Sequence, residues 1–318
     1  MSNSAIRQIE TGNIDALSAF HVNKNREYTQ FSRGKMQANV AEISLSQAQV
    51  MRESLNVGTR IDAAPAHCFL PFAVVLPQSS PYQFCGAVAN GTPFIQASGG
   101  IWEIKSKQKL DYVATVFLRE HFLQNFQTLT GTEPEADLLT SRLTQTSSTL
   151  QRHYAHQVLE IMQQIIAQPT LLQDDNIQRL MCSQLLKLTV DIINPALCAP
   201  EPMNQFNKRQ QGINRVVEYI REHCQQLPDI TQLCQIAQLS ERSLQYGFKE
   251  MFGITPVHYL RIIRLNGAHK ELLTLDKSTM SVAQVALNWG FVEFGRFSRD
   301  YKALFDQLPS QTLATTIS

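Results

Sequence analysis

The chain has 318 residues, of which 43% are hydrophobic and 17% are charged, as is usual for a globular protein of two domains. No apolar run approaches the ~20 residues of a membrane span, and the N-terminus lacks the basic start and apolar block of a secretory signal, so we expect a cytoplasmic protein. The net charge of +1 permits a nucleic-acid partner without requiring one.

Residues 1–33 are polar and carry an apolar series at helical spacing, which predicts a mainly helical start. That series is Ile14, Leu17 and Phe20. From about Gly34 the sequence changes to short alternating or apolar stretches separated by Gly, Pro, Asn and Ser. Turn signals at such regular intervals are typical of an antiparallel sandwich or barrel. We therefore predict a small β-barrel over about 34–119.

Aromatic residues recur through the predicted barrel. Buried aromatic rings belong to a core more often than to a ligand site, although a small barrel has room for one small ligand. The candidates for lining such a site are Phe72, Tyr82 and Trp102. Arg60 would suit an acidic ligand, but a surface arginine is the simpler interpretation.

Helical periodicity returns after the barrel. A short helix is predicted to end near Gly131, and two amphipathic helices follow over 147–167 and 174–193. In tandem they predict a helical hairpin that packs on the barrel or against a second subunit. The apolar stripe of the first helix holds Leu150, Tyr154, Val158, Ile161 and Ile165, and that of the second holds Ile177, Leu180, Met181, Leu185, Leu188 and Ile192.

Residues 194–207 contain three prolines and predict an extended linker. The linker divides a regulatory domain, 1–193, from a helical domain, 208–318. Residues 204–318 hold 13 Lys/Arg against 10 Asp/Glu, whereas the rest of the chain is slightly acidic. The fold class expected from these patterns is α+β, with an all-α C-terminal domain.

Two segments of the C-terminal domain share one plan, in which a short apolar helix and a tight turn precede a second helix. In the first segment, a helix over 231–239 precedes Ser240, a residue suited to cap the next helix. Leu244 and Phe248 are spaced to face inward. The opposite face is predicted to present Glu241, Arg242, Gln245, Tyr246 and Lys249.

The second segment repeats this plan. Val285 and Ala286 lie on its supporting helix, and Gly290 permits the unusual dihedral angle of the turn. Phe297 and Tyr301 are spaced to face inward. The candidates for contact with bases or phosphates are Glu293, Arg296, Ser298, Arg299 and Lys302.

A long helix over about 259–273 separates the two segments. Because major-groove faces recur every ~34 Å along a duplex, a rigid spacer of this kind would let one monomer read two adjacent grooves. Arg and Gln have the donor geometry that reads guanine and adenine. The arrangement predicts sequence-specific binding of double-stranded DNA, with more sequence preference from the first exposed helix and more affinity from the second, more basic one.

Over about 210–313 the sequence resembles the DNA-binding domain of the AraC/XylS family of bacterial transcription regulators. The first half of the resemblance is carried by Leu233, Ser240, Arg242, Leu244, Phe248, Lys249, Gly253, Pro256, Tyr259, Arg264, Leu265, Ala268 and Leu272. The second half is carried by Val285, Ala286, Gly290, Phe291, Phe297, Arg299, Tyr301, Lys302, Pro309 and Ser310. Three positions depart from the family pattern: Cys234 replaces a usual Ala, Gly295 a common Ser and Asp306 a usual Gly.

The resemblance implies a cupin-like N-terminal barrel that binds a small effector, a homodimer held by the 147–193 helices, and activation of transcription through RNA polymerase. The stretches KRQQGINRVVEYI and GKMQANVAEISLSQAQVMRES also resemble the ethanolamine-utilisation regulator branch. In the alternative reading, the N-terminal domain is only a dimerisation or partner-docking module without a small-molecule effector.

Signatures of enzymes and metal sites are missing from the sequence. It contains no G-x-S-x-G, H-E-x-x-H, Walker or dinucleotide motif. A catalytic cupin would need a His/Glu cluster in 34–119, where His67 is the sole histidine, and His153 and His156 lack a third ligand nearby. We expect no enzyme, no cofactor and no metal. The scattered cysteines predict free thiols, at Cys68, Cys85, Cys182, Cys198, Cys224 and Cys234.

Overall fold

The computed structural model describes residues 5–22, 24–97, 101–132, 141–193, 208–223, 228–274 and 280–315. Contacts divide the chain into two compact units. The sheet unit comprises Met1–Tyr28 and Met36–Glu201, and the helical unit comprises Thr29–Lys35 and Pro202–Ser318. The linker predicted over 194–207 lies outside the described residues.

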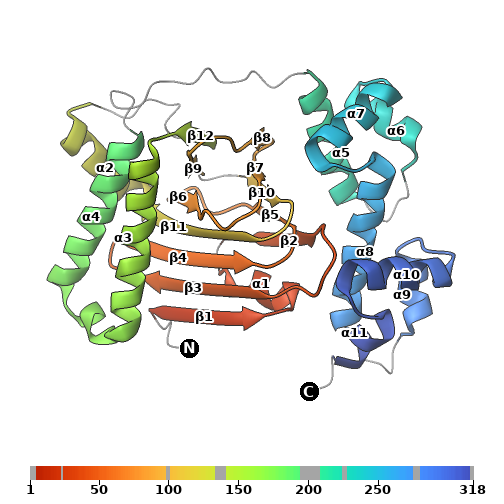
Figure 1. The fold of residues 1–318 in the computed structure, drawn as a ribbon, viewed down its shortest axis with the longest axis horizontal. Coiled ribbons are helices and arrows are strands. Elements are labelled where there is room, and N and C mark those ends of the chain that lie inside the picture. The colour runs from red at the N-terminus through yellow and green to blue at the C-terminus, as the bar shows by residue number, and fades with distance from the viewer. Residues whose placement is uncertain are drawn as a thin grey trace. The chain divides into compact units, whose positions relative to one another are not determined.

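The sheet unit holds two antiparallel sheets, of seven strands in the order β1-β3-β4-β11-β6-β9-β12 and of five in the order β2-β5-β10-β7-β8 (Figure 1). The larger sheet consists of β1 (Ile6–Thr11), β3 (Ala38–Ser44), β4 (Ala48–Leu55), β6 (Phe69–Val75), β9 (Pro93–Gln96), β11 (Leu110–Leu118) and β12 (Arg142–Gln145). The smaller sheet consists of β2 (Arg26–Gln30), β5 (Thr59–Ala63), β7 (Tyr82–Phe84), β8 (Ala87–Val88) and β10 (Trp102–Ser106).

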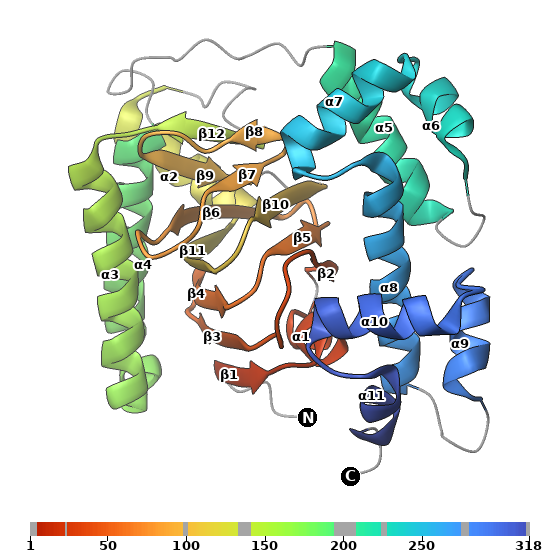
Figure 2. The same cartoon turned by 45° about the vertical axis from the view of Figure 1, so that its right-hand side comes forward.

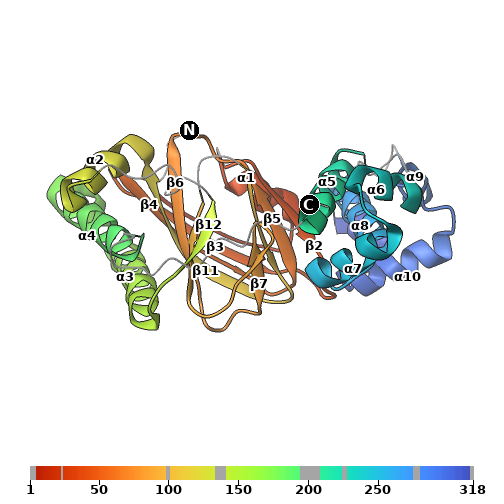
Figure 3. The ribbon, with the colours of Figure 1, turned by 90° about the horizontal axis from the view of Figure 1, so that it is seen from above.

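Both faces of the larger sheet are covered. Helices α2 (Arg119–Thr130), α3 (Ser148–Ala167) and α4 (Asp175–Ile193) lie together on one face (Figure 3). Side chains alternate along a strand, so Val113 and Phe117 of β11 join the core under the helices, while Tyr112 and Ala114 join a second core shared with the smaller sheet. Double coverage explains why β6 and β11 read as continuous apolar runs instead of a simple alternation.

The strands predicted over 34–119 are present, but the closed barrel is not observed, because neither sheet closes on itself among the described strands. The cupin-like detail therefore stays a prediction. The mainly helical start predicted for 1–33 is wrong. Among the described residues of this stretch, only α1 (Ile14–Phe20) is helical, and β1 pairs with β3 from Ile6↔Ile43 to Thr11↔Ala38. A distant strand supplies this pairing, which outweighs weak local preference.

The predicted helical hairpin is confirmed as α3 and α4, which pack on the larger sheet. The Tyr154 and Thr115 hydroxyls lie 2.6 Å apart in this contact. Leu180, which the sequence placed on the buried stripe, is instead 70% exposed. The buried face of α4 is centred near Cys182 and Leu185, and Leu180 lies about 200° around the helix from Cys182.

The helical unit contains two separate cores joined by one long helix, α8 (Pro256–Thr274) (Figure 2). Tyr259 and Leu260 of α8 belong to the first core, and Leu265, Ala268 and Leu272 belong to the second. The first core also uses α5 (Lys208–Glu222), α6 (Ile230–Ala237) and α7 (Glu241–Phe252), and the second uses α9 (Val282–Asn288), α10 (Phe294–Phe305) and α11 (Pro309–Thr315). Among the described residues, no helix is long and apolar enough to cross a membrane.

Segment Thr29–Lys35 belongs to the helical unit although it lies near the N-terminus. The backbone N–H of Gln30 donates to Asn266 Oδ1 at 2.9 Å, and Asn266 Nδ2 donates to the Gln30 carbonyl at 3.0 Å. The Gln30 side chain donates to the Leu304 carbonyl at 2.8 Å, and the Phe31 ring lies 5.5 Å from the ring of Tyr259. The segment thus contacts both cores through residues more than two hundred positions away in the sequence.

Candidate nucleic-acid interface and ligand cavity

The first helix-turn-helix segment is formed by α6 and α7. Asp229 caps α6 by accepting from Gln232 N at 2.8 Å, and the Gln232 side chain accepts from Asp229 N at 3.0 Å. Gln238 ends α6 with a φ of 53°, which makes the turn tight. Ser240 caps α7 as predicted, accepting from Ser243 N at 3.3 Å. Both helices thus begin at caps that are made by residues only three positions away in the sequence.

The two faces of α7 are confirmed. Leu244 and Phe248 are fully buried. At Gly247 an added Cβ would lie 2.1 Å from Ile213 Cδ1, so glycine is what allows α5 to approach closely. The Tyr246 ring lies 4.9 Å from the Arg209 guanidinium carbon. The five candidates on the outer face are all exposed, namely Glu241, Arg242, Gln245, Tyr246 and Lys249.

The second segment is formed by α9 and α10. Ser281 caps α9 by accepting from Gln284 N at 3.2 Å, and Gly290 turns the chain with a φ of 73°. Phe297 and Tyr301 are buried as predicted. The candidates Glu293, Arg296, Arg299 and Lys302 are exposed, while Ser298 is half-buried. Two exposed apolar residues, Val292 and Phe294, lie beside them and were not anticipated.

Side chains of α8 fix the placement of the second segment. Arg261 Nε donates to Asp300 Oδ2 of α10 at 2.5 Å. Gly267 contacts Trp289 so closely that an added Cβ would lie 2.1 Å from a ring carbon, and the indole N–H donates to Glu271 at 2.5 Å. These contacts hold α8 firmly against the helices of the second core, which form the second lobe of the helical unit. A rigid separation of α7 and α10 requires such contacts.

Asp306 occupies the position where the resembling family usually has glycine. It is the residue after α10 and adopts a left-handed conformation with a φ of 57°. Its N–H donates to the Lys302 carbonyl at 2.9 Å, which closes the helix in the usual way for this conformation. Asp tolerates left-handed dihedrals better than most residues, so the last turn keeps its shape without glycine.

A buried histidine links α8, α10 and α11. His269 Nδ1 lies 2.5 Å from the Tyr301 hydroxyl, which donates to Thr312 Oγ1 at 2.7 Å. Nδ1 is therefore assigned as the protonated nitrogen that donates to Tyr301. The imidazole stacks on Phe305 with ring centroids 4.2 Å apart. Burial lowers the pKa of His269 from 6.5 to about 4, so the ring is neutral at pH 7.

Acidification is expected to destabilise the helical unit through His269. The unfolded chain binds this proton near pH 6.5 and the folded one near pH 4. Neutral His269 therefore makes its full contribution to the free energy of unfolding above pH 6.5. As the pH falls towards 4, the free energy of unfolding decreases by roughly 2–3 kcal/mol. Urea unfolding followed by Trp289 fluorescence in a Trp102→Phe background measures it. His269→Phe should flatten the pH dependence, whereas the exposed control His258→Phe should keep it.

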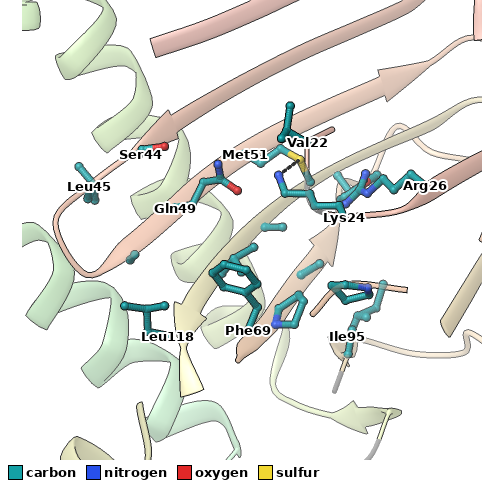
Figure 4. Close-up of a pocket in the computed structure, with 18 of the residues that line it drawn as sticks. Val22, Lys24, Arg26, Ser44, Leu45, Gln49, Met51, Phe69, Ile95 and Leu118 are labelled. Carbon is teal, nitrogen blue, oxygen red and sulfur yellow. Dashed lines mark hydrogen bonds between the residues drawn. The ribbon is translucent and has the colours of Figure 1, made fainter. Parts of the chain in front are cut away.

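The sheet unit contains a cavity of about 440 Å³ (Figure 4). Trp102 lines it as predicted, but Phe72 and Tyr82 are not among the lining residues. Phe72 points to the opposite face of β6, where it stacks on Phe94 and packs at a tilt against Phe122 in the core beneath the helices. Tyr82 is buried in the core shared by the two sheets.

Arg60 is not the surface arginine that the sequence suggested. It is 5% exposed and its guanidinium group pairs with Asp62, at 2.9 Å, and with Glu103. Both partners lie on the smaller sheet, and a local pattern does not reveal that adjacent strands bring the three charges together. Arg60 is therefore part of a buried ion-pair cluster and does not line the cavity.

A second cluster of charges lies at the cavity and was not predicted from the sequence. Arg7, Lys24 and Arg26 line the cavity and pair with two buried carboxylates, Glu42 and Glu53. Both carboxylates occupy inward positions of alternating strands. That inward placement was the available signal, because an acidic residue at a core position of a strand needs a buried partner.

The environment shifts the pKa values of this cluster. Burial alone would raise the pKa of Glu42, but hydrogen bonding by His21 and the charge of Lys24 outweigh it and lower the pKa to about 2. Burial likewise opposes ionisation of Glu53, whose pKa the Arg26 charge nevertheless holds well below its ordinary value. Burial lowers the pKa of Lys24 to about 8. Both carboxylates are thus ionised at pH 7.

Within the described part of the chain, no three His, Cys, Asp or Glu side chains gather closely enough to hold a metal ion. His153 and His156 are both exposed, and His156 lies 3.8 Å from Glu160. The described cysteines Cys68, Cys85, Cys182 and Cys234 are free thiols, and Cys198 and Cys224 lie outside the described residues.

Comparisons with known proteins match the C-terminal region. Residues 233–315 match the family described as "Helix-turn-helix domain". Over 105 residues the chain is 41% identical to a probable thc operon regulatory protein of Rhodococcus erythropolis, covering 33% of this chain and 32% of that protein. Over 108 residues it is 33% identical to the XylDLEGF operon transcriptional activator of Pseudomonas putida, covering 34% of each.

Among solved structures, a probable AraC family transcriptional regulator from Rhodopseudomonas palustris CGA009 is 30% identical, with 33% of this chain and 96% of that chain covered and a TM-score of 0.32. The matched region spans about a third of the length of the curated relatives. The relatives named here therefore match the helix-turn-helix domain.

Proposed function

We propose that this chain, which carries an AraC/XylS-type helix-turn-helix domain at its C-terminus, is a sequence-specific transcription regulator that binds double-stranded DNA. The observation that carries the proposal is the pair of exposed helices, α7 and α10, fixed on a single rigid spacer, α8. The proposed role is binding, because Arg, Lys, Gln, Ser and Tyr side chains such as those exposed on these helices are the kinds of group that contact DNA.

We propose that the two exposed helices contribute differently to base recognition and to phosphate binding. Arg242 and Gln245 of α7 suit guanine and adenine edges in the major groove. Arg296, Arg299 and Lys302 make α10 the more basic surface, which suits the phosphate backbone. The exposed Val292 and Phe294 at the start of α10 are suited to contact thymine methyl groups. More of the sequence preference would then come from α7 and more of the affinity from α10, with Arg299 as a candidate base contact on α10.

Selection from a random duplex pool tests the DNA-binding proposal. The full chain is used because the helical unit includes Thr29–Lys35 as well as the C-terminal residues. It should enrich one class of sites. Enrichment of no sequence at all, together with binding that is insensitive to salt, would overturn the proposal. The enriched site also supplies the duplex for quantitative binding.

Arg299→Ala is expected to weaken binding to the selected site by about 1–3 kcal/mol if Arg299 reads a base. Binding to random duplex should then change less, since phosphate contacts supply most non-specific affinity. Fluorescence anisotropy at two salt concentrations measures both. The matched control is Arg152→Ala, an exposed arginine on α3 that should leave DNA affinity unchanged. Equal losses on the two duplexes would make Arg299 a phosphate contact.

We also propose that the sheet unit responds to a small-molecule effector. The 440 Å³ cavity falls within the size range of ligand sites and favours this role over a docking module alone. Strand β2 begins with Arg26, which lines the cavity, and ends with Gln30, which bonds to Asn266 and Leu304. Ligand contact with Arg26 would therefore act on a strand whose far end is fixed to α8 and α10.

Three finer features stay proposals. A homodimer supported by the α3–α4 hairpin, transcriptional activation and contact with RNA polymerase are implied by the AraC/XylS resemblance. Leu180 and Ile166 are exposed apolar residues on the hairpin and are available to such a dimer. The resemblance to ethanolamine-utilisation regulators stays a prediction from sequence.

A further inference from the structure

We infer that the cavity of the sheet unit binds a small amphipathic monoanion, a hydrocarbon chain or ring with one carboxylate, whose head lies at Lys24, Arg26 and Trp102. The inference rests on the proposed function only in assigning this ligand the role of effector. Apolar walls, buried hydrogen-bond donors without a described partner and an excess of positive charge make the cavity suitable for such a ligand.

The walls of the cavity are apolar over most of their extent. They are contributed by both sheets and by the β3–β4 turn, and Leu45, Phe69, Ile95 and Leu118 are among the lining residues (Figure 4). A polyhydroxylated ligand would lose hydrogen bonds to water without replacement against such walls. A hydrocarbon body gains about fourfold in affinity for each buried methylene. The walls therefore favour hydrocarbon over sugar.

Unpaired hydrogen-bond donors lie at one end of the cavity. The Nε of Arg26 and the indole N–H of Trp102 have no hydrogen-bond partner among the described residues, although these side chains are only 6% and 7% exposed. Both residues line the cavity, and the Arg26 guanidinium carbon lies 5.5 Å from the Trp102 ring centroid. Buried N–H groups are nearly always paired in native proteins. These two neighbouring donors therefore indicate the position of an acceptor on a ligand.

The charge at this end is positive on balance. Three cations, Arg7, Lys24 and Arg26, face two carboxylates, Glu42 and Glu53. Lys24 Nζ contacts Glu42 and lies 3.9 Å from Met51 Sδ on the cavity wall (Figure 4). His21 Nδ1 also lies 2.9 Å from Glu42. One anionic group neutralises the excess charge, whereas an ammonium head would add to it.

The experiment measures binding of matched probes to the full chain by isothermal titration calorimetry. The probes are sodium octanoate, 1-octanol and octylamine, with sodium alkanoates of four to ten carbons as a length series. Octanoate is expected to bind at least tenfold more tightly than octanol, and octylamine least. Affinity should rise about fourfold per methylene until the cavity is filled. Equal binding of octanoate and octanol, or no binding of any alkanoate, would overturn the inference.

Two variants locate the head group. Lys24→Met keeps the length of the side chain without its charge and should weaken octanoate binding at least tenfold while octanol is unaffected. Trp102→Phe keeps an apolar ring without the N–H and should weaken octanoate severalfold. Lys187→Met changes an exposed lysine on α4 and serves as the control. Unchanged octanoate affinity in both Lys24→Met and Trp102→Phe would overturn the assignment.

The outcome can be separated from that of the proposed function. Selection of a duplex site uses the chain without any probe and tests the helical unit. A selected site without octanoate binding would refute the ligand class and leave the DNA-binding role standing. Octanoate binding without a selected site would support the ligand class and refute the DNA-binding role.

Discussion

Replacing Glu53 with alanine is expected to lower the free energy of unfolding of the sheet unit by about 3–5 kcal/mol. Glu53 is fully buried and accepts from Arg26 Nη1 at 2.5 Å, from the Tyr28 hydroxyl at 2.7 Å and from the Tyr112 hydroxyl. Without the carboxylate, the Arg26 charge would remain in the core with no anion beside it. The cost comes from that unpaired charge more than from the lost ion pair.

Urea unfolding followed by Trp102 fluorescence in a Trp289→Phe background measures the effect of Glu53→Ala on the sheet unit. The control is Asp191→Ala, which breaks the exposed Lys187–Asp191 pair of 2.8 Å and should cost at most about 0.5 kcal/mol. A second variant, Glu53→Ala with Arg26→Met, should recover part of the loss because it removes the unpaired charge. Comparable losses for Glu53→Ala and Asp191→Ala would contradict the buried-charge argument.

Phe297→Ala and Phe248→Ala are each expected to destabilise the helical unit by about 3–5 kcal/mol, but in different lobes. Phe297 packs against Phe291 and Tyr301 in the second core, and Phe248 packs against Phe252 and Tyr259 in the first. Both rings are almost wholly buried, so each truncation leaves a cavity in its own core. Among the described helices, α8 alone contributes to both cores, so the damage should stay largely local.

Hydrogen–deuterium exchange read by mass spectrometry distinguishes the two lobes. Phe297→Ala should accelerate exchange in α9, α10 and α11 and leave α6 and α7 protected, and Phe248→Ala should do the opposite. Uniform acceleration in both variants would show that α8 couples the lobes into one cooperative unit. Exposed Tyr246→Ala on α7 is the control and should leave exchange unchanged in both lobes.

Features that depend on local spacing could be predicted from the sequence. Apolar side chains three or four residues apart identified the buried faces of α3, α7 and α10, because a helix brings such positions onto one side whatever surrounds it. Ser240 and Gly290 marked the start and the turn of the two segments, since caps and left-handed turns are made by neighbouring residues. The candidate DNA-binding faces were therefore predictable.

Features that depend on partners distant in the chain become visible only in the folded structure. The contacts of Gln30 with Asn266 and Leu304, and of Glu53 with Arg26 and Tyr112, join residues far apart in the chain. Strand pairing also decided that β1 is a strand and that the sheets stay open. Local patterns do not encode which strands become neighbours. The cavity, whose walls come from both sheets, is visible only once those neighbours are assembled.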